Sequence, residues 1–245
     1  MITQSEVATE KIRDQIIRGD VSPGAHLLEN PLSQQLGMSR TPVRTALNTL
    51  AQEGLLEYVA KRGYRVKEFT IGEIVEAYNV RATLEGMACR LVAEKGLDRW
   101  SKNKLTKCVE DGEAIIKKTG AEITDDNFDG QAWRQMNTTF HQTIIEAAEN
   151  PFLQQQIRQI VFIPVATLFV LADWGSRVNA GNINRAQVDH INILDALERR
   201  QSARAESRMR EHLENTGRVI QDYYMNTQKL DNESSPNKSA DKSVA

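Results

Sequence analysis

The stretch that decides the fold is Gly37-Met38-Ser39-Arg40-Thr41-Pro42-Val43-Arg44, which continues into Thr45-Ala46-Leu47-Asn48-Thr49-Leu50. Gly37 predicts a tight turn, and Ser39 predicts the start of a helix. Pro42 fits the first helical turn, because the amides there have no partner within the helix. The apolar residues recur at helical spacing and predict one buried stripe: Val43, Ala46, Leu47 and Leu50.

The opposite side of this helix is polar at its first turn. Arg40, Thr41 and Arg44 lie off the apolar stripe, so we expect them to face solvent. Cationic and hydroxyl side chains at a helix N-terminus, after a short helix and a turn, are typical of recognition helices that enter the major groove of DNA. The stretch therefore predicts contact with double-stranded DNA.

The charge distribution supports this prediction better than the total charge does. The 245-residue chain has a formal net charge of −2, which by itself does not favour a nucleic-acid partner. Between Ser39 and Lys67, however, six basic and two acidic side chains give an excess of four positive charges. A local basic patch on an otherwise acidic protein indicates that one end of the molecule contacts DNA.

The segments before and after this helix predict a winged helix-turn-helix over residues 1–69. An amphipathic helix is expected over 5–18, and a short second helix begins at Asn30-Pro31 and ends at Gly37. The recognition helix follows that turn. A hairpin of two short strands then completes the module and forms the wing.

The wing is expected to pair residues 55–59 with residues 63–66. Its tip carries Lys61 and Arg62, followed by Gly63. The two basic side chains predict contacts with phosphates or with the minor groove.

From Thr70 onward the strand signals disappear, and long amphipathic segments follow one another. Residues 70–228 therefore predict an all-helical bundle, so the chain as a whole is expected to be mainly α-helical. Residues 229–245 are rich in Ser, Asn, Lys and Asp and are expected to be a disordered tail. The predicted helices lie near 70–95, 98–118, 129–149, 151–175, 183–200 and 202–226.

Other features limit the class of protein. Cys89 and Cys108 have neither metal-site spacing nor a histidine nearby, so they are expected to be reduced packing residues of a cytoplasmic protein. The opening residues lack a signal-peptide pattern. The apolar run over 160–172 contains Pro164 and is shorter than the roughly 20 residues of a membrane span, so it predicts a buried helix.

The N-terminal residues resemble the GntR family of transcription regulators, and the helical remainder is similar to the FadR-type ligand domain of that family, called FCD. The resemblance covers residues 5–226. It implies that Arg40, Thr41 and Arg44 contact bases and phosphates, and that Gly63 approaches the minor groove. The motifs that carry it are Gly24-Ala25-His26-Leu27-Leu28-Glu29, Leu36-Gly37-Met38-Ser39-Arg40-Thr41-Pro42-Val43-Arg44, Ala46-Leu47 and Glu53-Gly54-Leu55.

Three histidines of the helical part form a candidate metal site. Asn137 and His141 stand four residues apart on one helix face, and His190 and His212 lie on two later helices. Three neutral imidazoles and one oxygen suit a divalent ion, above all zinc, with nickel or manganese as alternatives. The FCD resemblance implies the same ligands, with Asn137 in place of the commoner Asp and therefore a weaker oxygen ligand.

An ion with three neutral ligands attracts an anion, which predicts a small organic acid as effector. Arg81 matches an arginine that lines this pocket in the family, and Arg134 shares the helix face of His141. The alternative for Arg81 is a surface ion pair with Glu85, four residues later on the same helix.

These observations together predict a homodimeric, metabolite-responsive regulator, more often a repressor in this family, that binds a two-fold symmetric operator. Two alternatives remain at this point. The histidine site could be purely structural while the DNA-binding role stays the same. A metal-dependent hydrolase is the less favoured alternative, because no HExxH-type general base accompanies the histidines.

Overall fold

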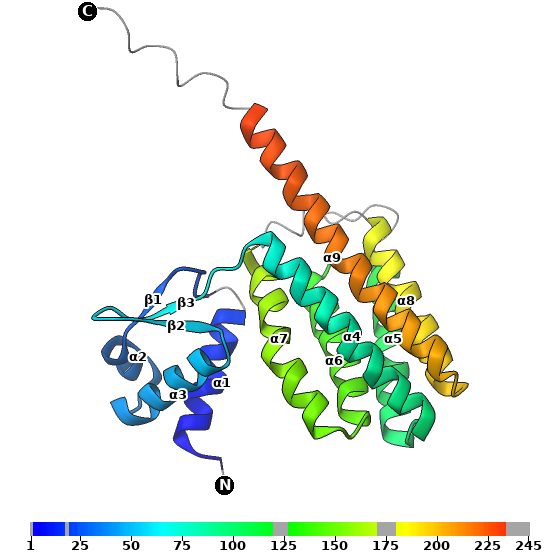
Figure 1. The fold of residues 1–245 in the computed structure, drawn as a ribbon, viewed down its shortest axis with the longest axis horizontal. Coiled ribbons are helices and arrows are strands. Elements are labelled where there is room, and N and C mark those ends of the chain that lie inside the picture. The colour runs from blue at the N-terminus through cyan, green and yellow to red at the C-terminus, as the bar shows by residue number, and fades with distance from the viewer. Residues whose placement is uncertain (1, 18–19, 120–126, 171–179, 234–245) are drawn as a thin grey trace, which may run out of the picture.

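The computed structural model describes residues 2–17, 20–119, 127–170 and 180–233. An N-terminal module of three helices and a small sheet lies beside a bundle of longer helices (Figure 1). The expected fold class, a winged helix-turn-helix followed by a helical bundle, is confirmed. Among the described residues, no helix combines the length and the apolar character that crossing a bilayer requires.

The N-terminal module follows the predicted order, with one addition. Gly37 ends the second helix with φ of 65°, and Ser39 caps the recognition helix in an extended conformation, both as expected. The added element is the strand β1. The elements are α1 (Gln4–Ile17), β1 (His26–Leu27), α2 (Glu29–Leu36), α3 (Arg40–Gln52), β2 (Leu56–Val59) and β3 (Gly63–Val66).

The sheet has the strand order β1-β3-β2, and both pairings are antiparallel. The two-strand prediction was therefore incomplete, because β1 is too short to show the alternation by which strands are recognised in a sequence. Gly63 is required where β1 meets β3: its φ is 80°, and a Cβ there would lie 3.0 Å from the carbonyl oxygen of Leu27. This contact gives Gly63 a structural role in addition to the predicted one.

A buried side chain attaches the wing to the recognition helix. Tyr64 of β3 is 7% exposed, and its hydroxyl donates a hydrogen bond to Oδ1 of Asn48 on α3. The apolar stripe of α3 is buried as predicted. The module's core contains Ala8, Ile12, Ile16, Leu27, Leu32, Val43, Ala46, Leu47, Leu50, Leu55, Leu56, Tyr64 and Val66.

The helical part begins with a complete capping box. The Thr70 side chain accepts a hydrogen bond from the Glu73 amide, and the Glu73 carboxylate accepts one from the Thr70 amide. The helices are α4 (Ile71–Lys95), α5 (Arg99–Thr119), α6 (Gly130–Ala147), α7 (Pro151–Val170), α8 (Ala180–Glu198) and α9 (Ser202–Glu233).

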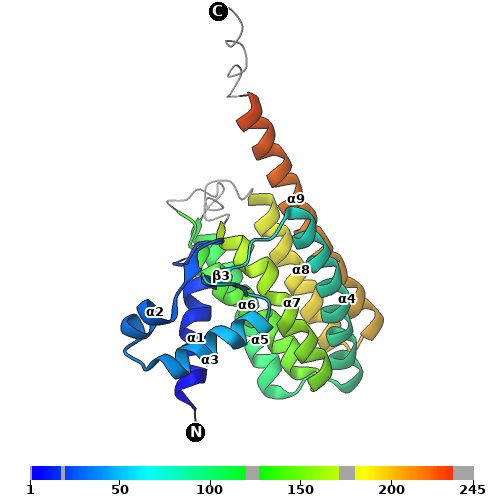
Figure 2. The ribbon, with the colours of Figure 1, turned by 60° about the vertical axis from the view of Figure 1, so that its left-hand side comes forward.

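The end of α9 differs from the sequence prediction, and the predicted apolar run lies largely outside the described residues. Helix α9 runs to Glu233 rather than ending near residue 226, and its last turns project beyond the bundle (Figure 2). The expected tail at 229–245 therefore begins inside this helix, and its residues from 234 onward lie outside the described part of the chain. The side chains of residues 161–170, and all of residues 171–179, also lie outside it, so burial of the apolar run stays a prediction.

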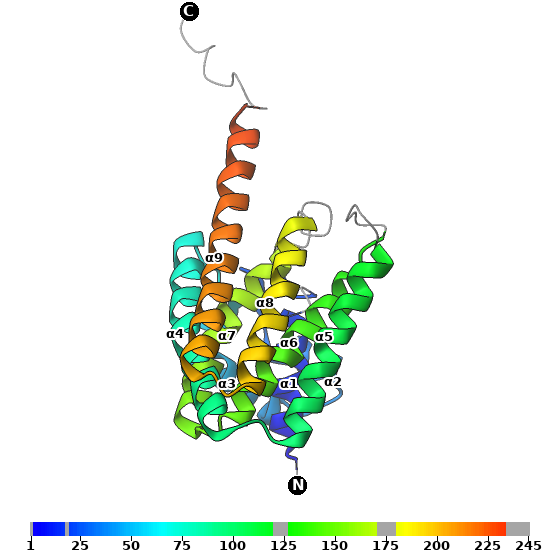
Figure 3. The same cartoon turned by 90° about the vertical axis from the view of Figure 1, so that its right-hand side faces the viewer.

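Helices α4 and α9 lie side by side in close contact (Figure 3). Two glycines allow this approach. A Cβ at Gly86 of α4 would lie 2.7 Å from Cγ of Arg210 and 3.2 Å from the carbonyl oxygen of Glu206. A Cβ at Gly217 of α9 would lie 3.1 Å from Cβ of Tyr78. Side chains at these positions would force the two helices apart.

We therefore expect Gly86→Ala to lower the free energy of unfolding by about 1–3 kcal/mol, as overpacking does in cores. Gly72→Ala is the matched control on the same helix, because a Cβ there meets nothing closer than 3.9 Å. It should be neutral or stabilising, by up to about 1 kcal/mol, since alanine is the better helix former. Urea unfolding of both variants measures the difference, and equal stabilities would contradict the packing argument.

Candidate metal centre and nucleic-acid interface

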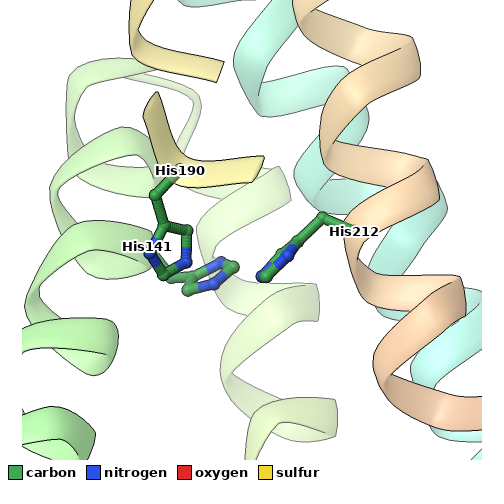
Figure 4. A group of neighbouring side chains, drawn as sticks. All are labelled: His141, His190 and His212. Atoms are coloured by element: carbon green, nitrogen blue, oxygen red, sulfur yellow. The ribbon is translucent and has the colours of Figure 1, made fainter. Parts of the chain in front are cut away.

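Three buried histidines from three helices meet inside the bundle. His141 of α6, His190 of α8 and His212 of α9 are 6%, 0% and 4% exposed. One ring nitrogen of each lies within 4.8 Å of the others, which is close enough for a single ion to bind all three. Figure 4 shows the rings turned toward one another. The structure thus brings together the three histidines that the sequence singled out.

Carboxylates contact two of these rings through Nδ1. Oε2 of Glu85 lies 2.7 Å from Nδ1 of His141, and Oδ2 of Asp189 lies 3.3 Å from Nδ1 of His212. An ionised carboxylate only accepts hydrogen bonds, so each Nδ1 donates, and in the neutral ring Nε2 then keeps its lone pair for a ligand. Proteins commonly orient metal-binding histidines in this way.

His190 is held differently. Its ring packs against Phe140, with centroids 4.4 Å apart, and stacks on Trp133 at 6.3 Å. Both of its ring nitrogens are buried without a hydrogen-bond partner among the described residues. Leaving such a group unsatisfied costs about 1–3 kcal/mol. An ion bound between the three rings would provide the missing partner for one of these nitrogens.

The surroundings of His190 and His141 favour the neutral form of these two imidazoles. Burial lowers the pKa of His190 well below its ordinary value, and the nearby His212 and His141 lower it further. Burial also lowers the pKa of His141, although Glu85 opposes the shift. A neutral imidazole is the form that binds metal, so this donor set fits a divalent ion of the zinc class.

Arg81 and Glu85 form a buried ion pair, which corrects the alternative of a surface pair. Nε of Arg81 donates to Oε1 of Glu85 over 2.8 Å, and the two side chains are 9% and 0% exposed. Burial alone would raise the pKa of Glu85, but Arg81 and His141 outweigh it and lower that pKa to about 2. Arg81 is therefore linked to the histidine cluster through Glu85.

The sequence reasoning missed the role of Glu85, although its signal was present. Glu85 continues the buried apolar stripe of α4, formed by Tyr78, Ala82, Cys89 and Val92. A carboxylate within such a stripe must be paired, because burying an unpaired charge is prohibitively costly. Periodicity could thus have shown its burial, but not the partner on α6.

Asn137 and Arg134, the other two residues predicted for this site, are less buried than the histidines. Asn137 is half-buried on α6, one turn before His141, and Arg134 is exposed on the same helix. The structure does not test whether Asn137 binds the ion or whether Arg134 contacts an effector. Both stay predictions.

On the N-terminal module, the recognition-helix side chains are exposed as expected. Arg40 and Arg44 are 59% and 56% exposed, and Thr41 is exposed beside them. Both arginines turn toward Glu29 at the start of α2. Nε and Nη2 of Arg44 each donate to this carboxylate over 2.8 Å, and Arg40 does so over 3.3 Å. Glu29 thus holds two guanidinium groups on one face.

The wing tip presents Lys61 and Arg62 to solvent. Val59 pairs with Gly63 across the hairpin, and the amide of Arg62 donates to the carbonyl oxygen of Val59 over 2.9 Å. Lys61 adopts a left-handed conformation with φ of 65°. The recognition helix and the wing therefore supply separate groups of exposed cations from one small module.

Two known protein families match separate parts of this chain. Residues 4–66 match the gntR family of bacterial regulatory proteins, and residues 76–215 match the FCD domain. The chain is 31% identical over 216 residues to the probable D-xylose utilization operon transcriptional repressor of Paenarthrobacter nicotinovorans, covering 86% of this chain and 88% of that protein. It is 25% identical over 204 residues to the HTH-type transcriptional repressor GlaR of Escherichia coli (strain K12), covering 82% and 89%.

Among solved structures, the fold is similar to that of E. coli McbR/YncC. The TM-score is 0.76 at 22% sequence identity, covering 91% of this chain and 100% of that chain. The matching families and relatives are transcription regulators and not enzymes, so the hydrolase alternative is set aside. The chain belongs to the GntR family of transcription regulators, with an FCD effector-binding domain behind its winged helix-turn-helix.

Proposed function

We propose that this chain is a homodimeric cytoplasmic repressor whose affinity for a two-fold symmetric operator changes when a small carboxylate binds at a divalent ion in its helical domain. The observation that carries the proposal is the cluster of His141, His190 and His212, whose ring nitrogens converge within 4.8 Å. The two relatives described above are named as transcriptional repressors. Repression is extended to this chain by similarity.

The DNA-binding half of the proposal assigns separate tasks to helix and wing. Arg40, Thr41 and Arg44 lie at the exposed N-terminal turn of α3, where recognition helices contact base edges. Lys61 and Arg62 at the wing tip would contact phosphates. Two copies of the chain would then contact the two halves of a symmetric site.

In the helical domain, the three histidines would hold the ion, with Asn137 as a weaker oxygen ligand. Zinc is the favoured metal. A bound divalent ion with neutral ligands would supply positive charge and open positions for an anion. The ion is a better partner for a carboxylate effector than Arg81, because Glu85 already neutralises Arg81. Arg81 and Arg134 are retained as candidate effector contacts.

We expect His190→Ala to lose the ion and the response to organic acids while keeping DNA affinity, because the cluster lies in the helical domain. His26→Ala is the matched control, since His26 is exposed on β1 of the DNA-binding module. Elemental analysis after incubation with zinc, nickel or manganese measures the ion. Wild-type protein that takes up none of these metals would refute the site.

A metal that is retained without any effector response would favour the structural alternative. In that case zinc would raise the melting temperature of the wild type. No organic acid in a thermal-shift screen would raise it further, and none would change the affinity for the operator. A response to one class of carboxylate that disappears in His190→Ala would support the proposal.

We expect Arg40→Ala and Arg44→Ala each to weaken binding to a specific site, by about 1–3 kcal/mol for a lost bidentate base contact. The probe is a duplex that the wild-type protein selects from a random-sequence library. Arg199→Ala is the control, because Arg199 is also exposed, at 66%, and paired with a carboxylate, but it belongs to the helical domain. Unchanged footprints for both α3 variants would refute the recognition-helix assignment.

The wing should behave differently. Lys61→Ala and Arg62→Ala should weaken binding to all DNA sequences alike, because phosphate contacts carry no sequence information. Each loss should reduce the slope of log K against log salt by about 0.9. Titrations at several salt concentrations measure this slope, and an altered sequence preference with an unchanged slope would argue against phosphate contacts.

A further inference from the structure

Glu85 occupies an unusual position, because each oxygen of one buried carboxylate serves a different partner. Oε1 accepts a hydrogen bond from Nε of Arg81, and Oε2 accepts one from Nδ1 of His141, over 2.8 Å and 2.7 Å. Glu85 itself is 0% exposed. Arg81 and Glu85 lie on α4, whereas His141 lies on α6. The carboxylate therefore connects a fixed cation on one helix with a candidate ligand on another.

We propose that Glu85 is a positioning residue that fixes His141 in the tautomer able to bind the ion, and that Arg81 makes the charge of Glu85 indispensable for this role. This inference rests on the proposed metal site. With its proton held on Nδ1 by Glu85, His141 keeps the lone pair of Nε2 for the ion.

Arg81 decides what happens when the carboxylate becomes an amide. A guanidinium can only donate hydrogen bonds, so in Glu85→Gln it must take the single amide oxygen. The amide NH2 then faces Nδ1 of His141 and can only donate to it. His141 must accept that hydrogen bond, its proton moves to Nε2, and the lone pair that would bind the ion is lost.

The experiment measures zinc affinity by competition with a chromophoric chelator, using the full-length chain and zinc alone as the probe. We expect Glu85→Gln to bind zinc about 10–100-fold more weakly than the wild type, the usual range for residues that orient metal ligands. Glu94→Gln is the matched control on α4. Glu94 stands four residues after Arg90 as Glu85 does after Arg81, but it is 54% exposed and 3.9 Å from its arginine.

A double variant distinguishes positioning from a general structural role. In Arg81→Met with Glu85→Gln, no guanidinium claims the amide oxygen, so this oxygen can turn to His141 and accept from Nδ1. We therefore expect the double variant to bind zinc more tightly than Glu85→Gln alone. If Glu85 only stabilised the bundle, the second substitution would weaken zinc binding further or leave it unchanged.

Nitrogen-15 NMR of the histidine rings gives a readout that does not need the ion. The zinc-free wild type should carry the His141 proton on Nδ1, and Glu85→Gln should carry it on Nε2. Thermal unfolding by circular dichroism checks that each variant is folded. A folded Glu85→Gln with wild-type zinc affinity would overturn this inference alone. A wild type that binds no zinc would overturn the proposed metal site as well, so the two failures are distinguishable.

Discussion

The buried carboxylate of Glu85 is the constraint around which the helical domain is arranged. A charge removed from water is tolerated only with close partners of the right kind, and removing one partner of such a group is strongly destabilising. Here those partners come from the same helix, as Arg81, and from a distant one, as His141. Helix α4 also approaches α9 closely, at Gly86 and at Gly217. Packing and polar satisfaction thus fix α4, α6 and α9 relative to one another.

In the DNA-binding module, too, paired polar side chains connect separate elements. Glu29 gathers Arg40 and Arg44 from one helix face, and Tyr64 joins the wing to α3 through Asn48. Because Glu29 is paired with both arginines, any contact of their guanidinium groups with DNA would compete with this carboxylate.

Local signals in the sequence were enough for much of this structure. Gly37 and Ser39 set the turn and the cap of the recognition helix, and the spacing of His141, His190 and His212 on separate helices indicated their meeting point. Contacts between distant residues were not accessible in this way. The pairing of β1 with β3 depends on two residues without a pattern of their own, and the contact from Glu85 to His141 spans 56 positions. Periodicity shows that a residue is buried, but not which side chain it meets there.

The short strand β1 has a consequence for how such a protein can be regulated. Because β1 lies between α1 and α2 and pairs with β3, the chain entering the helix-turn-helix and the chain leaving the wing are held in one sheet. The hydrogen bond from Tyr64 to Asn48 also joins the wing to the recognition helix. In the proposed homodimer, a signal from the helical domain would not easily change the internal structure of either DNA-binding module. In the proposed repressor, the signal would instead alter the spacing and tilt between the two DNA-binding modules, and the resulting mismatch with the helical repeat of the operator would relieve repression.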